Sequence, residues 1–330
     1  MSAMQNERVI ARITRRDLLR GGMTFGAALA LAPLWPEWVS GAAQQTAAPP
    51  ADPLAAMRAQ LGAAPLQALK LSDTLTMLSG PGGNVVVLNG PDGKIVVDTF
   101  VQPAWNALKQ ALDGMGSAPV KAVVDTHWHF DHADNNGNFR KAGAAVVAHE
   151  NTSKRLSGTH ELLGMKFLPA PPEMLPTQTF KDAHKLDANG EQVTLGYIPP
   201  AHTDTDIYIR FSKGNVLHLG DVYFNGIYPF IDGSTGGSIN GMIDGANLAI
   251  KLADPATKIV PGHGPLGDRA TLTQYAEMLV TVRDRVRKLK TSGRSLAETV
   301  AEKPTKDLDA VWGKGFMPPD NFVALVYNTL

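Results

Sequence analysis

The 330-residue sequence contains no cysteine. Such a chain forms no disulfide, and it has no thiolate to offer a metal ion. Its stability must therefore come from a hydrophobic core, for which 44% of the residues are available, and from any bound ligands. A metal site in this chain has to be built from imidazole and carboxylate groups.

The sequence also lacks an excess of either charge, since 31 Lys and Arg side chains balance 31 Asp and Glu side chains. The only dense basic cluster, at residues 283–290, follows a helical pattern and includes Asp284. This pattern indicates a solvated helix face. We therefore expect no nucleic-acid partner, because nucleic-acid-binding proteins carry a basic patch or stripe.

The N-terminal segment has the composition of an export signal. Arg15 and Arg16 precede a stretch rich in Leu and Ala, and small residues follow at 40–43. These are the parts of a cleavable leader, and the paired arginines resemble the twin-arginine type. The apolar stretch 23–34 is too short to span a bilayer, which needs about 20 residues. We expect no stable membrane insertion after cleavage.

This leader predicts contact with the twin-arginine export machinery and a periplasmic location. Twin-arginine export moves folded proteins, so metals would be loaded before the chain crosses the membrane. The predicted organisation is a signal peptide at 1–43, a tether and N-terminal segment at 44–66, and one catalytic domain with C-terminal helices at 67–330.

The strongest motif places three histidines and one aspartate within six positions, directly after the apolar run 121–125. In an extended segment, residues two apart point the same way, so His127 and His129 are suited to grip one ion. Asp131 and His132 would turn past it toward a second ion. Imidazole and carboxylate ligands suit zinc, with iron or manganese as alternatives.

Three further candidate ligands, His202, Asp221 and His263, stand beside glycine or proline at predicted strand ends. In order and local context, the HxHxDH motif, a later His, a Gly-Asp pair and a final Pro-Gly-His-Gly sequence resemble the metallo-β-lactamase superfamily over roughly residues 70–290. The resemblance implies that His127, His129 and His202 bind a first metal, that Asp131, His132 and His263 bind a second, and that Asp221 bridges them.

The same resemblance implies an α/β fold, the four-layer αββα sandwich. Helical periodicity at 53–61, 103–112, 240–252 and 268–289 is consistent with helices on the outside. Short β-type runs, separated by glycine- and proline-rich turns, occupy the two halves between them. The predicted strands are 74–78, 84–88, 94–97, 121–125, 144–148, 193–198, 207–211, 216–219 and 258–260.

The predicted metals determine the expected chemistry. A water between two divalent cations loses a proton near neutral pH, and the hydroxide attacks a carbonyl or phosphoryl centre. Asp131 is the expected catalytic residue, because its carboxylate would orient that hydroxide. We therefore expect a zinc-dependent hydrolase with two zinc ions per chain and a small-molecule substrate. Export favours a cyclic amide or ester, with a β-lactam-type substrate first.

Three alternatives stay open. A branch of the family that uses cysteine as a ligand to the second metal carries a lysine three residues later, whereas this chain has Asp221 and Phe224; this difference favours a lactonase or thioesterase. A mononuclear iron dioxygenase acting on sulfur compounds would need only a two-histidine, one-carboxylate site such as His127, His202 and Asp221. An exported binding protein would keep the metals without turnover.

Other residues near the motifs receive structural or substrate-binding expectations. Alternation with the ligands points Trp128 and Phe130 away from the metals. Tyr228, the glycine-rich stretch 232–237 and the proline-rich stretch 168–176 are candidates for mobile substrate loops. The remaining histidines are expected to be structural or on the surface; they are His149, His160, His184 and His218.

Overall fold

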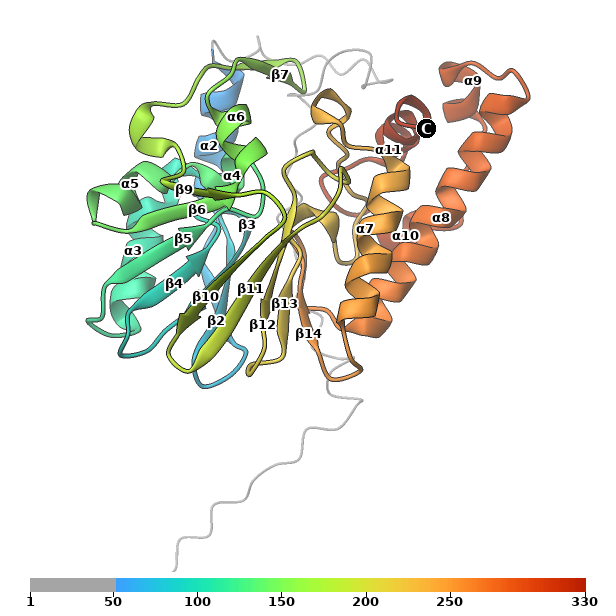
Figure 1. Cartoon of the computed structure of the whole chain (residues 1–330). Coiled ribbons are helices and arrows are strands. Elements are labelled where there is room, and N and C mark those ends of the chain that lie inside the picture. The colour runs from blue at the N-terminus through green and yellow to red at the C-terminus, as the bar shows by residue number, and fades with distance from the viewer. Residues whose placement is uncertain (1–51) are drawn as a thin grey trace, which may run out of the picture.

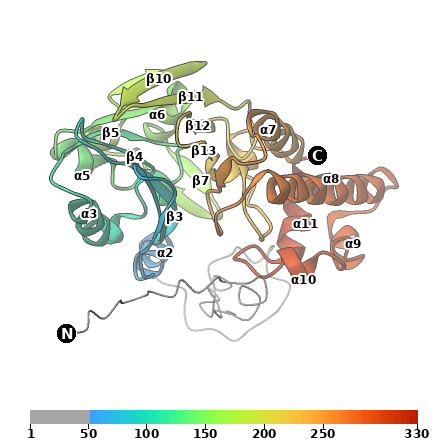
Figure 2. The same cartoon turned by 90° about the horizontal axis from the view of Figure 1, so that it is seen from below.

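The computed structural model describes residues 52–330. The predicted leader at 1–43 and the first part of the tether lie outside the described residues. Two β-sheets pack face to face, and helices cover both outer faces (Figures 1 and 2). This is the predicted four-layer αββα sandwich. Within the described residues, no helix combines the length and apolarity needed to cross a membrane.

The first sheet has seven strands in the order β1-β2-β3-β4-β5-β6-β9. Strands β1 to β4 are antiparallel, and β4, β5, β6 and β9 are parallel. Their bounds are β1 (Gln67–Lys70), β2 (Leu75–Gly80), β3 (Gly82–Leu88), β4 (Lys94–Val97), β5 (Val120–Val124), β6 (Ala145–His149) and β9 (Gln178–Phe180).

The second sheet has five strands, β10 to β14 in sequence order, and only its last pair is parallel. They are β10 (Ala183–Ala188), β11 (Glu191–Tyr197), β12 (Ile207–Phe211), β13 (Val216–His218) and β14 (Lys258–Val260). A separate hairpin comprises β7 (His160–Leu162) and β8 (Met165–Phe167).

Helices of the first half lie on the outer side of the first sheet or at its end (Figures 1 and 2). They are α2 (Pro53–Gly62), α3 (Trp105–Gly114), α4 (Phe130–Ala133), α5 (Asn136–Lys141) and α6 (Glu150–Leu156), with 3-10 turns η2 (Gln102–Ala104) and η3 (Pro172–Met174). The second half contributes α7 (Ile239–Leu252), α8 (Arg269–Thr291), α9 (Leu296–Ala301), α10 (Asp309–Trp312) and α11 (Pro319–Asn328), with η4 (Gly220–Val222) and η5 (Gly233–Thr235).

Successive side chains of a strand point to opposite faces of the sheet, and this alternation explains how the layers pack. In β3, Val85 and Val87 pack with α3 on the outer face, whereas Val86 and Leu88 pack between the sheets. In β13, Val216 faces the space between the sheets and Leu217 faces α7 and α8. Because a strand buried on both faces needs apolar residues at every position, these strands read as continuous apolar runs. The core therefore has three sections, one between each pair of layers.

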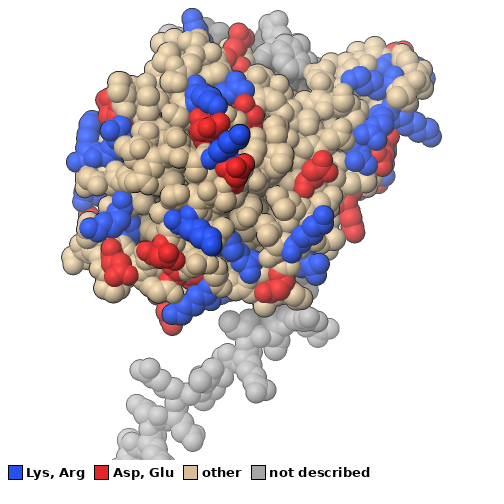
Figure 3. Space-filling model, in the orientation of Figure 1, with Lys and Arg blue, Asp and Glu red and all other residues tan. Residues whose placement is uncertain are grey.

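Charged residues are spread over the surface. Figure 3 shows Lys and Arg interspersed with Asp and Glu on the visible face. In the basic cluster of α8, Arg285 forms a salt bridge with Asp307, and Arg283 forms one with Asp284. These pairs agree with the expected solvated helix face.

Candidate metal centre

All the predicted ligands meet at one edge of the sandwich, beyond the carboxyl ends of strands. His127 and His129 lie in the loop after β5, which runs into α4 with Asp131 and His132. The loop after β11, η4 after β13 and the loop after β14 supply the other three. Rigid strands thus fix where each short loop presents its side chain.

The ligand atoms form two groups, and within each group they lie within 4.8 Å of one another. The first group is His127, His129, His202 and Asp221, and the second is Asp131, His132 and His263. The structure therefore brings together every residue of the predicted set and groups the histidines in the way that the family resemblance implies.

Asp221 lies between the two groups. Its Oδ2 atom is 3.5 Å from His202 Nε2 and 3.4 Å from His263 Nε2. Its Oδ1 atom is 3.2 Å from His132 Nε2. The same Oδ2 atom lies 4.0 Å from His127 Nε2, so one carboxylate reaches two histidines of each group.

Three buried atoms at the centre have no hydrogen-bond partner: His127 Nε2, His132 Nε2 and Asp221 Oδ1. Buried polar atoms are almost always paired, so each such atom needs an explanation. In the described part of the chain, histidines are the only basic side chains that form salt bridges with Asp131 or Asp221. Nitrogen and carboxylate donors without a nearby Lys or Arg fit a divalent cation.

Asp98 and Thr126 orient two histidines of the HxHxDH motif through hydrogen bonds. His132 Nδ1 donates to Asp98 Oδ2 at 2.7 Å, and Thr126 Oγ1 donates to the same oxygen at 2.9 Å. The Thr126 oxygen in turn lies 3.0 Å from His127 Nδ1 and accepts its proton. These bonds leave the Nε2 atoms of both histidines directed at the centre.

The rings of His129 and His202 are also held by hydrogen bonds to oxygen atoms. His129 Nε2 donates to Asp232 Oδ2 at 3.2 Å, and His202 Nδ1 donates to the carbonyl oxygen of Phe230 at 2.9 Å. Oxygen partners on the outer ring nitrogen fix the tautomer of a metal-binding histidine and raise its basicity. When a ring held in this way is neutral, its free lone pair points inward.

Sequence reasoning missed Asp98 and Asp232. Asp98 follows the apolar strand β4 directly, which is the same signal that singled out Asp221 after β13. Its backbone φ of 64° is unusual for a residue other than glycine and marks a sharp change of direction at this strand end. Asp232 was placed in a loop by its glycine-rich context, and no local signal connects it with His129.

Glycine is required at two positions that touch the ligands. A Cβ atom at Gly83 would lie 2.1 Å from the His132 ring, and one at Gly262 would lie 1.9 Å from Asp221 Oδ1. Any side chain would therefore displace a ligand. The glycine before His263 is explained by this close approach as well as by the turn.

Burial and neighbouring charges shift the pKa values of the two groups in different ways. Burial lowers the pKa of His202 to about 4 and holds that of His127 well below its usual value, so both rings are neutral. Burial opposes the charge on Asp131, but His132 and His263 outweigh it and lower the pKa of Asp131 to about 2. Asp131 is thus an anionic carboxylate.

The other aromatic and histidine predictions have mixed outcomes. Trp128 is buried and packs against Phe167, with ring centroids 5.9 Å apart, which agrees with the expected packing role; its ring also lies edge-on to His129, with centroids 4.9 Å apart, so it is not directed away from the ligands as expected. Tyr228 is fully buried and stacks on Phe322, so the expectation that it belongs to a substrate loop is wrong. His218 donates to the Asn84 carbonyl oxygen, which agrees with a structural role.

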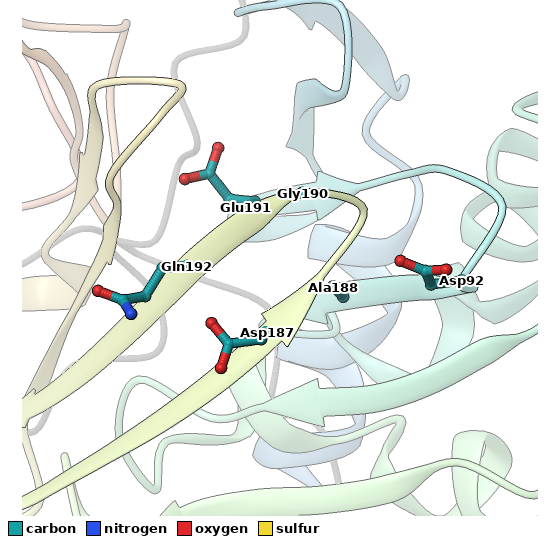
Figure 4. Close-up of a pocket in the computed structure, with 6 residues that line it drawn as sticks. All are labelled: Asp92, Asp187, Ala188, Gly190, Glu191 and Gln192. Carbon is teal, nitrogen blue, oxygen red and sulfur yellow. The ribbon is translucent and has the colours of Figure 1, made fainter.

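A surface depression of about 330 Å³ lies far from these ligands, at the turn between β10 and β11 (Figure 4). His202 follows the opposite end of β11. Asp92 and Asn189 hydrogen-bond reciprocally there, joining the turns of the two sheets, and Glu191 accepts from two backbone N–H groups. The carboxylates of Asp92 and Glu191 therefore have structural partners, and the side chains of this depression do not converge on one point (Figure 4).

Comparison with known proteins identifies the family and agrees with the fold. The chain matches the metallo-beta-lactamase superfamily over residues 78–263. A probable metallo-hydrolase of Methanocaldococcus jannaschii is 26% identical over 194 residues, covering 56% of this chain and 89% of that protein.

Solved structures share the fold at lower identity. A metallo-beta-lactamase from Pontibacter korlensis superposes with a TM-score of 0.55 at 18% identity, over 65% of this chain and 99% of that one. The DIM-1 metallo-beta-lactamase gives a TM-score of 0.54 at 19% identity, over 66% and 99%. The family match spans more than half of the sequence and contains all seven ligand candidates, of which His263 is its last residue. The chain therefore belongs to the metallo-beta-lactamase superfamily.

Proposed function

We propose that this protein is an exported dinuclear zinc hydrolase that opens a cyclic amide or ester, with β-lactam-type compounds as the first substrates to test. The observation that carries this proposal is the pair of ligand groups sharing Asp221. Seven converging donors exceed the four ligands that a single zinc ion usually takes, whereas two ions would each receive three donors of their own and share Asp221. The hydrolase activity in the name of the archaeal relative supports the same reaction class.

In this proposal, His127, His129 and His202 hold one zinc ion, Asp131, His132 and His263 hold the other, and Asp221 contacts both. Bound there, the metals would supply Lewis acidity and lower the pKa of water toward neutrality. The protein supplies the orientation. Asp98, Thr126 and Asp232 hold the outer nitrogens of the ligand rings, so the donor atoms need little reorganisation.

Asp131 has a second role in this proposal. Its side chain is 14% exposed, whereas those of the first-group histidines are 5% exposed or less. An anionic carboxylate at the open side of the centre accepts a hydrogen bond from the attacking water and keeps its lone pair directed at the substrate. Asp131 is therefore the proposed catalytic residue.

Phe224 affects the choice of substrate. It is fully buried and stacks on His263, with ring centroids 5.4 Å apart and an interplanar angle of 11°. It therefore offers no cation to a substrate carboxylate. The carboxylate of a β-lactam drug would therefore have no cationic partner at this position, which makes a lactonase, acting on an uncharged cyclic ester, the second candidate.

Turnover of a chromogenic cephalosporin and of a chromogenic lactone by the zinc-loaded protein tests the proposed function. Loss of hydrolysis in Asp131→Ala separates the site from adventitious zinc. Turnover of either substrate that the variant loses would support the proposal. No turnover of either substrate by a protein carrying two zinc ions would reject it.

The proposed iron alternative is distinguished by metal content. A mononuclear dioxygenase would use a two-histidine, one-carboxylate site and leave Asp131, His132 and His263 without a metal. The convergence of those three side chains within 4.8 Å favours the dinuclear hydrolase.

Export and a periplasmic location are proposed from the paired Arg15 and Arg16, the apolar stretch that follows them and the small residues at 40–43. Replacing both with lysine in the full chain is expected to leave the protein in the cytoplasmic fraction of the producing cell. Undiminished transport of the variant would remove the twin-arginine assignment.

A further inference from the structure

The chain continues after the matched family region and returns to the metal centre. The family match ends at His263, and α8 to α11 follow it. In Figure 1 these helices, coloured orange to red, lie beside the second sheet. The segment 313–318 joins α10 to α11, and within it the ring centroid of Phe316 lies 5.8 Å from that of His263.

Several contacts fix this segment in place. The Tyr228 N–H donates to the carbonyl oxygen of Trp312 at 2.8 Å, and the Tyr228 hydroxyl donates to Asp309 Oδ1 at 2.9 Å. A Cβ atom at Gly315 would lie 2.6 Å from Ile227 Cγ2, so the backbone of the segment lies directly against the loop between η4 and η5. Phe316 is thus presented from an anchored backbone.

Phe316 also lies on the open side of the centre. The side chains of His263 and Asp131 are 19% and 14% exposed, whereas those of His127 and His202 are 1% and 0% exposed. A substrate must therefore approach from the side of His263 and Asp131. Phe316 is half-buried beside that entrance, and its ring lies 6.0 Å from the buried ring of Phe224.

We propose that Phe316 forms an apolar wall of the substrate site, so that the C-terminal extension selects substrates with an uncharged apolar group next to the bond that is cleaved. For the reaction itself, this inference rests on the proposed hydrolase function. An aromatic face attracts apolar rings through burial and edge or stacking contacts. An anionic substituent against the face of this ring would lose hydration without gaining a hydrogen bond from it.

The test uses the binding of simple thiols to the full chain loaded with Co²⁺, followed by visible absorption, and so needs no substrate turnover. 2-Phenylethanethiol and ethanethiol share the metal-binding group and differ in the apolar ring. The unchanged protein is expected to prefer the phenyl compound. Phe316→Ala should reduce that preference about threefold to tenfold, and Phe316→Leu should reduce it less.

Val311→Ala is the matched control, because this exposed residue lies on α10 in the same part of the chain and should leave the preference unchanged. Thermal melting of each variant identifies any that fails to fold. An equal preference in the unchanged protein, Phe316→Ala and Phe316→Leu would overturn the inference, as would failure of both thiols to bind the cobalt-loaded protein. Hydrolysis is measured separately from thiol binding. Inactivity on every ester and amide would reject the proposed function, whereas loss of the preference for the phenyl thiol in Phe316→Ala would still support the apolar wall.

Discussion

The Nδ1 atom of His129 lies 2.9 Å from the Nε2 atom of His202, although 73 positions separate the two residues in the chain. The other nitrogen of each ring already donates to an oxygen, of Asp232 and of Phe230 respectively. In neutral rings, two lone pairs therefore face each other at this distance. Their mutual repulsion is relieved by a cation between or beside them, which is the role assigned to the first metal.

Asp232→Asn is expected to weaken the first metal site. The amide cannot fix the outer nitrogen of His129 as a donor as strongly as the carboxylate does, and loss of such a partner costs about 10-fold to 100-fold in metal affinity. Competition with a chromophoric chelator measures the change. Asp187→Asn, which alters an exposed carboxylate on β10, serves as the control, and an affinity equal in both variants would remove Asp232 from its positioning role.

His202→Ala is expected to lose metal from the first group while the second group keeps its ion. The three members of the second group retain their side chains in this variant, and Asp221 remains beside them. Metal analysis after dialysis should give about one ion per chain, and excess zinc should restore part of the activity. Retention of two ions together with full activity would show that His202 is not a ligand.

Asp131→Ala should leave the fold intact and lower hydrolysis by about 10²-fold to 10⁴-fold, the range for a group that orients a proton or a nucleophile. Circular dichroism checks the fold, and kcat is compared at equal zinc content so that metal loss is not mistaken for a catalytic effect. A kcat within about twofold of the unchanged protein would contradict the orienting role.

The metal-free protein should lose stability as the pH rises. Burial alone would lower the pKa of His263, but Asp221 and Asp131 outweigh it and raise that pKa from 6.5 to about 9. The folded state therefore binds this proton more tightly than the unfolded state. The stabilisation is complete below the unfolded pKa of 6.5 and is lost as the pH passes through 9.

Melting temperatures in the presence of a chelator measure this loss. His263→Gln should show a smaller fall in melting temperature over the same pH window, because it lacks the titrating group. Zinc should stabilise the unchanged protein more at high pH, since metal binding displaces the proton. A metal-free melting temperature that rises between pH 6.5 and 9 would contradict the charge assignment for His263.

Much of the sandwich was predictable because its central strands are buried on both faces. The continuous buried apolar runs 85–88 in β3, 95–97 in β4 and 122–124 in β5 indicate these strands from the sequence alone. By contrast, β10 alternates between exposed and half-buried residues, and all four residues of β1 are exposed. Edge strands of this kind gain their structure from pairing with a neighbour, which local sequence does not show.

The ligands were predictable for a related reason. Histidine and aspartate at the ends of apolar runs stand out in the sequence, and the HxHxDH spacing is dense. The residues that hold them are separated by long stretches of chain: Asp232 lies 103 positions from His129. Phe316 lies beyond the matched family region in a segment without regular structure, so only the folded chain shows that it reaches His263.

The number of metal ions per chain tests the central claim most directly. The protein would be dialysed against zinc and then against metal-free buffer, and zinc would be measured against protein concentration, with His263→Ala as the comparison. The two ligand groups predict two zinc ions in the unchanged protein and one in the variant. A single ion in both would contradict the dinuclear centre and favour a mononuclear site built from the first group.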